Sequence, residues 1–305
     1  MSNPFTIDTL PKVKGIYTFD APLAPLTTLK IGGCADVLFE PASFDDLANF
    51  LKHKNEDTPV TLLGEGSNML VRDGGIAGVV IYLGKGTDNV ILDGHKIYAE
   101  AGAKSGKVAR TAREAALTGV AFLCGIPGSI GGALKMNAGA YGQETADTLA
   151  SVNVITDKGE RKTLQPEELN FSYRHSDLPK GWIYEGAIFV LTPGDKEEIR
   201  AQMRQINRDR STSQPLNKPS SGSWFKNPTL PNGEKTNAWK VVAEAGCRGW
   251  QVGQAQVSEK HSNFFVNLGG ATASDILELT VKVQKEVKAK FGVDLVQEVR
   301  VIGRD

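Results

Sequence analysis

Two stretches of dense glycine constrain this chain more than any other feature. Residues 64–86 and 119–142 contain seven glycines each, and together they hold 14 of the 33 glycines in the 305-residue chain. Glycine adopts positive φ without strain and lets the backbone approach a ligand closely, so such loops are suited to cradling a phosphate or a flat ring. Tight turns between short strands would use the same residues, and for either loop alone this alternative stays open.

Both loops also carry side-chain hydrogen-bond donors. The first begins GEGSN at residues 64–68, directly after a predicted strand, and the second contains Ser129 and Asn137. Neither loop is a GxGxxG opening a helix or a GxxxxGK[ST] motif, so neither a Rossmann nor a P-loop nucleotide site is predicted. The residues therefore indicate a phosphate or dinucleotide binder of another kind.

The overall composition narrows the class of protein further. Thirty-five Lys and Arg residues balance 35 Asp and Glu residues, and this neutrality argues against a nucleic-acid-binding protein. The 40% of hydrophobic residues predicts a packed core, and the length predicts two or three domains. No apolar run approaches the roughly 18–20 residues that cross a membrane, so no membrane association is expected. We leave the oligomeric state open, with a monomer favoured.

The cysteines and the first residues bear on the compartment. Cys34, Cys124 and Cys247 are odd in number and widely spaced, which predicts neither a disulfide framework nor a zinc site. Residues 1–5 lack the basic and apolar stretches of a secretion signal. We therefore expect a reducing, cytoplasmic compartment and no metal. GxSxG and HExxH are absent too, which argues against the corresponding hydrolases.

Hydrophobic periodicity and turn residues predict an α+β chain. Candidate capping boxes begin two of the helices, at Ser43 with Asp46 and at Thr272 with Asp275. The Ser-, Pro- and Asn-rich residues 211–223 indicate a linker or domain edge. The expected helices are 43–54, 105–118, 195–210, 238–245 and 272–290. The expected strands are 60–63, 78–83, 96–100, 152–156 and 161–164 as a hairpin, 183–191, 263–268 and 298–302.

Ordered motifs from about residue 20 to the end resemble those of the UDP-N-acetylenolpyruvoylglucosamine reductase family. They are TTLKIGG (27–33), GEGSN (64–68), GIPGSIGG (125–132), MNAGAYG (136–142), YR (173–174), GSWFKNP (222–228), AGCRG (245–249), VSEKHSNF (257–264) and EVRVIG (298–303). The next predicted strand follows Arg174 within about ten residues. That spacing is typical of the family's shorter class, which lacks an extra tyrosine-bearing loop.

The resemblance implies a fold and a domain organisation. The expected fold is α+β, with a vanillyl-alcohol-oxidase-type FAD-binding domain of two α+β subdomains and a smaller α+β substrate-binding domain. The first subdomain would span residues 1–85, with the C-terminal strand segment 292–305 returning to it. The second would span 86–206, and the substrate-binding domain 207–291.

The resemblance also implies a reaction. NADPH would reduce FAD, and the reduced FAD would pass a hydride to the enolpyruvyl vinyl carbon of UDP-N-acetylenolpyruvoylglucosamine. The product, UDP-N-acetylmuramate, is a peptidoglycan precursor, so the implied biological role lies in cell-wall biogenesis, cell shape and division. By matching motifs, Ser223 would donate the proton, while Arg174 and Glu298 would stabilise the enolate.

The cofactor and substrate contacts follow from the same motifs. FAD would be held by Gly64, Glu65, Gly66, Ser67, Asn68, Gly125, Ile126, Pro127, Gly128, Ser129, Gly132, Asn137, Ala138 and Gly139. The substrate would be bound by Tyr173, Lys226, Asn227 and Arg248, while His261 and Asn263 are either substrate contacts or strand-end packing. Neither glycine-rich stretch contains histidine, which favours non-covalent FAD. An FAD-dependent sugar or alcohol oxidase of the same fold, and a catalytically silent flavin or nucleotide-sugar binder, remain the alternatives.

Overall fold

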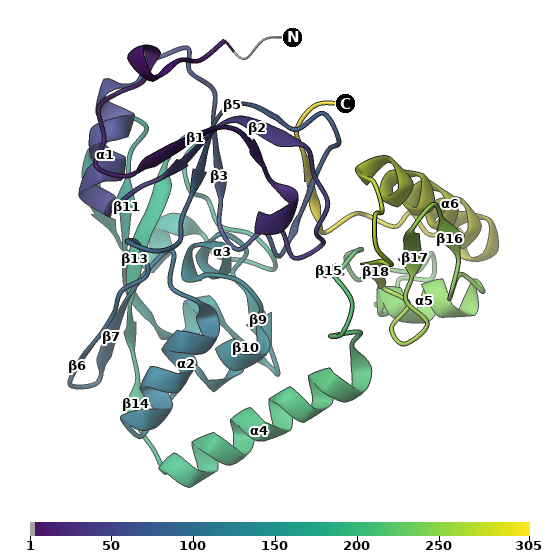
Figure 1. Ribbon diagram of the computed structural model, residues 1–305. Helices are drawn as coiled ribbons and strands as arrows, with labels where there is room; N and C mark the ends of the chain where they lie inside the picture. Colours follow the sequence, from purple (N-terminus) through teal and green to yellow (C-terminus); the bar gives the residue numbers. More distant parts are fainter. Residues whose placement is uncertain (1–3) are drawn as a thin grey trace. The chain divides into compact units, whose positions relative to one another are not determined.

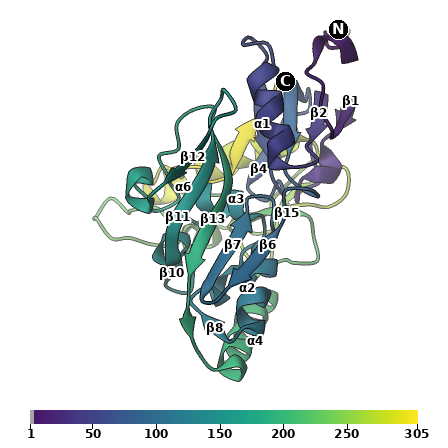
Figure 2. The same ribbon diagram turned by 90° about the vertical axis from the view of Figure 1, so that its left-hand side faces the viewer.

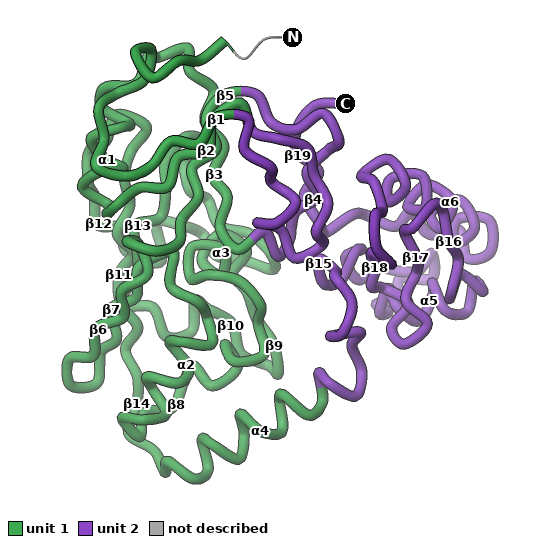
Figure 3. The backbone as a smooth tube through the Cα atoms, viewed as in Figure 1, with its two compact units in different colours: residues 1–19, 36–65, 78–209 green, residues 20–35, 66–77, 210–305 purple. Residues whose placement is uncertain are grey.

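The computed structural model describes residues 4–305 and consists of two compact units, coloured separately in Figure 3. Unit 1 contains the described residues up to 19 together with 36–65 and 78–209. Unit 2 contains residues 20–35, 66–77 and 210–305. The boundary at 65/66 falls inside the first glycine-rich stretch. The expectation about residues 1–5 rests partly on residues 1–3, which lie outside the described part.

Unit 1 is built around a five-stranded antiparallel sheet, whose strands are spread out one beside the next in Figure 2. The strand order is β12-β11-β13-β7-β6, and β11 and β12 form the hairpin that the sequence predicts. The strands are β6 (Val90–Asp93), β7 (Lys96–Glu100), β11 (Leu149–Ile155), β12 (Arg161–Leu164) and β13 (Ile183–Val190). Their apolar side chains form a core cluster with helices α1 (Phe44–His53) and α2 (Ser105–Glu114).

A second sheet, in the order β1-β2-β5-β3, contributes to the same core (Figure 1). Its strands are β1 (Ile16–Pro22), β2 (Cys34–Glu40), β3 (Val60–Leu63) and β5 (Ile76–Tyr82). β3 pairs in parallel with β5, and the first glycine-rich stretch begins where β3 ends. The pairing of β3 with β5 therefore fixes the position of Gly64 in unit 1.

The start of α1 differs in part from the predicted capping box. The Ser43 hydroxyl accepts a hydrogen bond from the Asp46 N–H at 3.3 Å, as expected of an N-cap. The Asp46 carboxylate does not return it. It accepts instead from the backbone N–H groups of Lys14, Gly15 and Ala42, at 2.7, 2.8 and 3.1 Å. The predicted reciprocal bond is wrong because the buried Asp46 carboxylate accepts from Ala42 and from the distant residues Lys14 and Gly15, and not from the Ser43 N–H.

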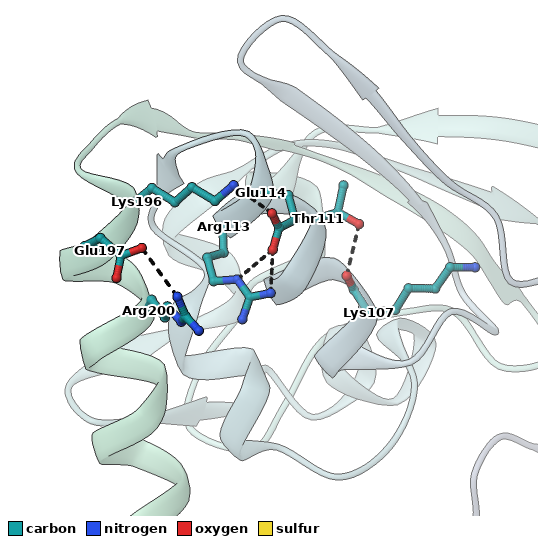
Figure 4. Close-up of polar contacts among 7 residues, drawn as sticks. All are labelled: Lys107, Thr111, Arg113, Glu114, Lys196, Glu197 and Arg200. Atoms are coloured by element: carbon teal, nitrogen blue, oxygen red, sulfur yellow. Dashed lines mark hydrogen bonds and ion pairs between the residues drawn. The ribbon is translucent and has the colours of Figure 1, made fainter.

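Helix α2 is shorter than predicted and is tied to α4 (Lys196–Ser213). It ends at Glu114 because Ala116 adopts φ +53° and β8 (Leu117–Thr118) pairs with β14 (Thr192–Pro193). Figure 4 shows Glu114 between Arg113 and Lys196, with a carboxylate–Nζ distance of 2.7 Å to Lys196. Hydrogen bonds from Lys196 and Arg113 lower the pKa of Glu114 to about 2.

Unit 2 has a core of its own beneath an antiparallel sheet in the order β15-β18-β17-β16. Trp224 stacks on Phe265 with ring centroids 5.1 Å apart, and Phe225 meets the same ring edge-on at 5.8 Å. The strands are β15 (Ser220–Ser223), β16 (Gln251–Val252), β17 (Ala255–Val257) and β18 (Phe264–Asn267), and the helices are α5 (Ala238–Glu244) and α6 (Ala273–Phe291). The capping box at Thr272 is confirmed, with both bonds at 3.0 Å.

The ends of unit 2 correct one prediction and show a long-range pairing. Residues 211–213 belong to α4 and 220–223 to β15, so a linker over 211–223 is wrong in part, whereas the alternative of a domain edge agrees with the unit boundary between residues 209 and 210. β19 (Arg300–Ile302) pairs in parallel with β4 (Met69–Val71), which brings the C-terminal strand back to residues far earlier in the chain. The division into 1–85, 86–206 and 207–291 stays a prediction.

The short elements complete the description. The second glycine-rich stretch contains α3 (Ile130–Lys135) and β9 (Gly139–Ala140), and β10 (Gln143–Glu144) follows directly after it; the sequence predicted none of the three. The 3₁₀ helices are Ile7–Thr9, Ala24–Leu26, Ala121–Gly125, Thr145–Thr148 and Pro166–Leu169. Within residues 4–305, no helix combines the length and apolar character that crossing a membrane requires.

Candidate active site

The two glycine-rich stretches meet in unit 1. A Cβ placed on Gly64 would lie 2.9 Å from the Ser129 hydroxyl oxygen, so only glycine leaves that hydroxyl undisturbed. The same hydroxyl lies 3.9 Å from where a Cβ on Gly132 would be. Lys104 adds an ion pair with Glu65, with an Nζ–carboxylate distance of 3.5 Å. Bare backbone from both stretches thus surrounds one hydroxyl donor.

Backbone hydrogen bonds fix the second stretch along the residues that follow β7. The N–H of Ser105 donates to the Gly128 carbonyl at 3.0 Å, and that of Ile130 donates to the Ala103 carbonyl at 2.8 Å. Gly128 adopts φ +121°, a conformation that disfavours other residues. The buried Ser105 hydroxyl has no hydrogen-bond partner among the described residues. The Ser129 hydroxyl beside Gly64 and Gly132, and the Ser105 hydroxyl that has no partner among the described residues, fit the polar groups of a bound FAD.

Other predicted cofactor residues of this stretch have structural contacts of their own. Asn137 is buried, with its amide oxygen accepting from Ala146 N–H at 3.0 Å and its amide nitrogen donating to the Ser172 carbonyl at 3.4 Å. Ala138 donates its N–H to Ala133, and Gly139 pairs with Glu144. Gly125 ends the 3₁₀ helix Ala121–Gly125, the Ile126 N–H donates to the Leu123 carbonyl, and Pro127 connects this end to Gly128.

Residues 66–77 of the first stretch belong to unit 2. Gly66 adopts φ +59°, and a Cβ there would lie 2.7 Å from the Leu26 carbonyl oxygen. Its own carbonyl accepts from the Thr28 N–H at 3.3 Å, beside the TTLKIGG motif. Ser67 leads into Asn68, whose amide donates to the Glu298 carbonyl at 3.4 Å. The end of this loop thus lies against Glu298, which precedes β19; the strand predicted at 298–302 begins only at Arg300.

Ser223 and Glu298 are brought together in unit 2 by backbone pairing. Ser223 ends β15, and the next N–H, of Trp224, donates to the Asn263 carbonyl at 2.7 Å. On the other side, the Glu298 N–H donates to the Trp224 carbonyl at 2.9 Å. Both Ser223 and Glu298 are half-buried. The GSWFKNP segment is therefore hydrogen-bonded through Trp224 to Asn263 on one side and to Glu298 on the other.

Arg174 lies in unit 1, on a tight turn closed by two hydrogen bonds between Ser172 and His175, at 3.0 and 3.2 Å. Arg174 adopts φ +57°, a left-handed conformation that costs a non-glycine residue energy and is often found at functional sites. Its guanidinium lies over the Tyr173 ring, 5.2 Å from the ring centroid. Tyr173 is 58% exposed. The turn displays a cation and an aromatic ring together.

The predicted substrate residues of unit 2 are partly engaged in structural bonds. The Asn227 amide oxygen accepts from the Ala238 N–H at 3.1 Å at the start of α5. Arg248 donates to the Glu259 carbonyl at 2.7 Å, and the Lys226 backbone N–H donates to Val296 at 2.8 Å. None of these three hydrogen bonds was evident from the sequence.

His261 and Asn263 differ in what surrounds them. Asn263 is buried, and its amide bonds both backbone groups of Phe225, at 2.9 and 2.8 Å. Of the two interpretations left open, strand-end packing describes Asn263. Burial lowers the pKa of His261 below its ordinary value, and the nearby charge of Arg248 lowers it further. Among the described residues, no three His, Cys, Asp or Glu side chains gather as metal ligands.

Comparison with known proteins first defines the class. Residues 35–165 match a family model described as an FAD binding domain, and residues 214–302 match one described as the C-terminal domain of UDP-N-acetylenolpyruvoylglucosamine reductase. Together with the mixed sheets, these matches identify an FAD-dependent oxidoreductase with the predicted vanillyl-alcohol-oxidase-type fold.

Full-length relatives then define the family. UDP-N-acetylenolpyruvoylglucosamine reductase from Parvibaculum lavamentivorans is 48% identical over 97% of this chain and 94% of its own length. That from Paramagnetospirillum magneticum is 48% identical over 97% and 95%. A crystal structure of the reductase from Thermus caldophilus matches with a TM-score of 0.81 and 36% identity, over 96% of this chain and 100% of that chain. The chain belongs to the UDP-N-acetylenolpyruvoylglucosamine reductase family, and the motif resemblance is confirmed.

Proposed function

We propose that this protein reduces UDP-N-acetylenolpyruvoylglucosamine to UDP-N-acetylmuramate with NADPH as reductant and FAD as cofactor. Family membership over nearly the whole chain supports the reaction. One structural observation supports the site: backbone pairing of Trp224 with Glu298 brings the Ser223 and Glu298 segments side by side. A hydroxyl and a carboxyl group on paired segments suit the protonation of an enolate.

FAD, when bound, supplies two-electron chemistry, accepting a hydride and delivering it to an electron-poor double bond. Gly64, Glu65, Gly128, Ser129 and Gly132 would hold its polar groups, because they combine bare backbone with a hydroxyl donor. The remaining cofactor contacts are assigned by the motifs to Gly66, Ser67, Asn68, Gly125, Ile126, Pro127, Asn137, Ala138 and Gly139.

The protein's own residues handle the charge that builds up on the substrate. Once the enolpyruvyl group has gained a hydride at its terminal carbon, negative charge develops on the carbon beside its carboxylate. The Arg174 guanidinium binds the resulting enolate, because its fixed fork of donors matches a carboxylate. The Ser223 hydroxyl then donates the proton that completes the lactyl group, and Glu298 hydrogen-bonds the enolate from the paired segment.

Other residues bind the remote parts of the substrate. Lys226 and Arg248 face the diphosphate as cations, Asn227 contributes an amide, and Tyr173 packs against the substrate beside Arg174. The three free cysteines support a reducing, cytoplasmic location, where NADPH is the common reductant. The protein acts as a monomer, with FAD-binding subdomains over 1–85 and 86–206 and the substrate-binding domain over 207–291.

The test separates the two half-reactions. In Ser223→Ala, reduction of the flavin by NADPH should keep its wild-type rate in stopped-flow absorbance. Reoxidation of the reduced flavin by the enolpyruvyl substrate should slow by about 100-fold or more, as expected for loss of a general acid. Ser220→Ala, in the same strand, is the matched control. An unchanged second half-reaction in Ser223→Ala would refute the assignment of the proton donor.

A further inference from the structure

The turn that carries Arg174 is fastened to the second glycine-rich stretch on its C-terminal side. Ser176 is fully buried, and its hydroxyl donates to the Lys135 carbonyl at 3.1 Å. Lys135 returns the bond, its Nζ donating to the Ser176 carbonyl at 2.9 Å. The buried Tyr184 hydroxyl donates to the Ser176 hydroxyl oxygen at 2.9 Å. The Ser176 hydroxyl thus both donates and accepts within a closed set of bonds.

The N-terminal side of the same turn is fastened nearby. The Asn137 amide donates to the Ser172 carbonyl at 3.4 Å, two residues along the chain from Lys135. Asn137 is itself held by the Ala146 N–H. One short segment, residues 135–137, is therefore hydrogen-bonded to the chain on both sides of Tyr173 and Arg174.

These hydrogen bonds can hold a backbone conformation that is unfavourable by itself. Arg174 adopts φ +57°, a left-handed conformation that is disfavoured for every residue with a Cβ. A two-residue turn with a 58%-exposed tyrosine has little packing of its own to hold that conformation. Strained backbone persists only where the surroundings over-determine it. The bonds from residues 135–137 and from Tyr184 provide that constraint.

We propose that Ser176 and Tyr184 are positioning residues for the reaction, which fix the Arg174 turn to the segment that binds the cofactor. The inference rests on the proposed function, because it presupposes that Arg174 binds the enolate. Lys135 and Asn137 belong to the stretch matched to FAD binding, so the guanidinium is placed by the same segment that places the flavin. Displacing a charged clamp by about 1 Å is enough to cost on the order of 100-fold in rate.

Two variants of the holoenzyme test this. Ser176→Ala removes the central hydroxyl, and Tyr184→Phe removes only the outer O–H donor, which keeps the test usable if the first variant folds poorly. Ser151→Ala is the control: it is half-buried in β11, beside the strand that carries Tyr184, and its hydroxyl bonds no described residue. We expect flavin reduction by NADPH within about threefold of wild type in all three. We expect reoxidation by substrate to slow about 10- to 100-fold in Ser176→Ala and less in Tyr184→Phe.

A double-mutant cycle distinguishes positioning from general stability. If Ser176 acts through Arg174, then Ser176→Ala should have no further effect on the second half-reaction in an Arg174→Ala background. A full Ser176→Ala effect in that background, or single variants that match Ser151→Ala, would overturn the inference. If Arg174→Ala itself reoxidised at the wild-type rate, the proposed role of Arg174 would fail, and the inference with it. A slow Arg174→Ala beside normal Ser176→Ala and Tyr184→Phe would refute the positioning role alone.

Discussion

Replacing Asn263 with alanine should destabilise unit 2 strongly. Its side chain is 3% exposed and makes a paired contact with one residue. The amide oxygen accepts from the Phe225 N–H at 2.9 Å, and the amide nitrogen donates to the Phe225 carbonyl at 2.8 Å. Phe225 is itself 1% exposed. Water therefore has little access to either backbone group once the amide is gone.

The expected loss of stability follows from the two hydrogen bonds that the Asn263 amide makes. A buried backbone group left without its partner costs about 1–3 kcal/mol, so two such groups cost about 2–6 kcal/mol. Whole domains are stable by only about 5–15 kcal/mol, so the change is a large share of the total. The same bonds hold the segment between Ser223 and Lys226, so we also expect the substrate half-reaction to slow.

Urea unfolding followed by tryptophan fluorescence measures this, because Trp224 is fully buried beside the altered contact. The control is Asn232→Ala, whose side chain accepts one hydrogen bond from the Glu234 N–H in an exposed turn. The control should lose less than about 0.5 kcal/mol. An Asn263→Ala variant as stable as Asn232→Ala would refute the claim that this amide supports the Ser223 segment.

Three further results are expected. The Gly159→Ala variant should lose about 1–3 kcal/mol more free energy of unfolding than Gly94→Ala. Both glycines have positive φ, but only a Cβ at Gly159 would meet a backbone atom, the Ala48 carbonyl oxygen at 2.3 Å. Equal losses in the two variants would contradict this. The folded protein binds a proton at His261 less readily than the unfolded chain, so its free energy of unfolding should fall as the pH drops below about 6.5, and this component should be missing in His261→Gln. Denaturing the holoprotein should release all of its flavin, and any that stayed on the chain would contradict non-covalent binding.

Local patterns in the sequence predicted the longer helices and the central strands of the fold, but not β1, β2 or most of the short strands. The strands at 60–63, 96–100 and 161–164 have the predicted bounds, because apolar runs there are bordered by turn residues. The predicted end of α2 is wrong because Ala115 and Ala116 are good helix formers, whereas β8 pairs with a strand some 75 residues later. Helix α3 was missed because Gly131 and Gly132 disfavour helices.

The candidate site was likewise predictable only in part from the sequence. The motifs identified the segments that carry Ser223, Glu298 and Arg174, since each motif is contiguous. The supporting bonds were out of reach, because Asn263 meets Phe225 across 38 residues and Lys135 meets Ser176 across 41. Short-range periodicity contains no signal for such pairs, and Asn, Lys and Ser are residue types that are common at surfaces.

Anaerobic turnover of the purified, flavin-loaded protein tests the central claim most directly. With NADPH present, adding UDP-N-acetylenolpyruvoylglucosamine should start NADPH oxidation, with one UDP-N-acetylmuramate formed for each NADPH consumed. NADPH oxidation that requires oxygen and ignores the enolpyruvyl substrate would contradict the account and favour an oxidase. A flavin that stays oxidised with NADPH and substrate both present would contradict it in favour of a silent binder.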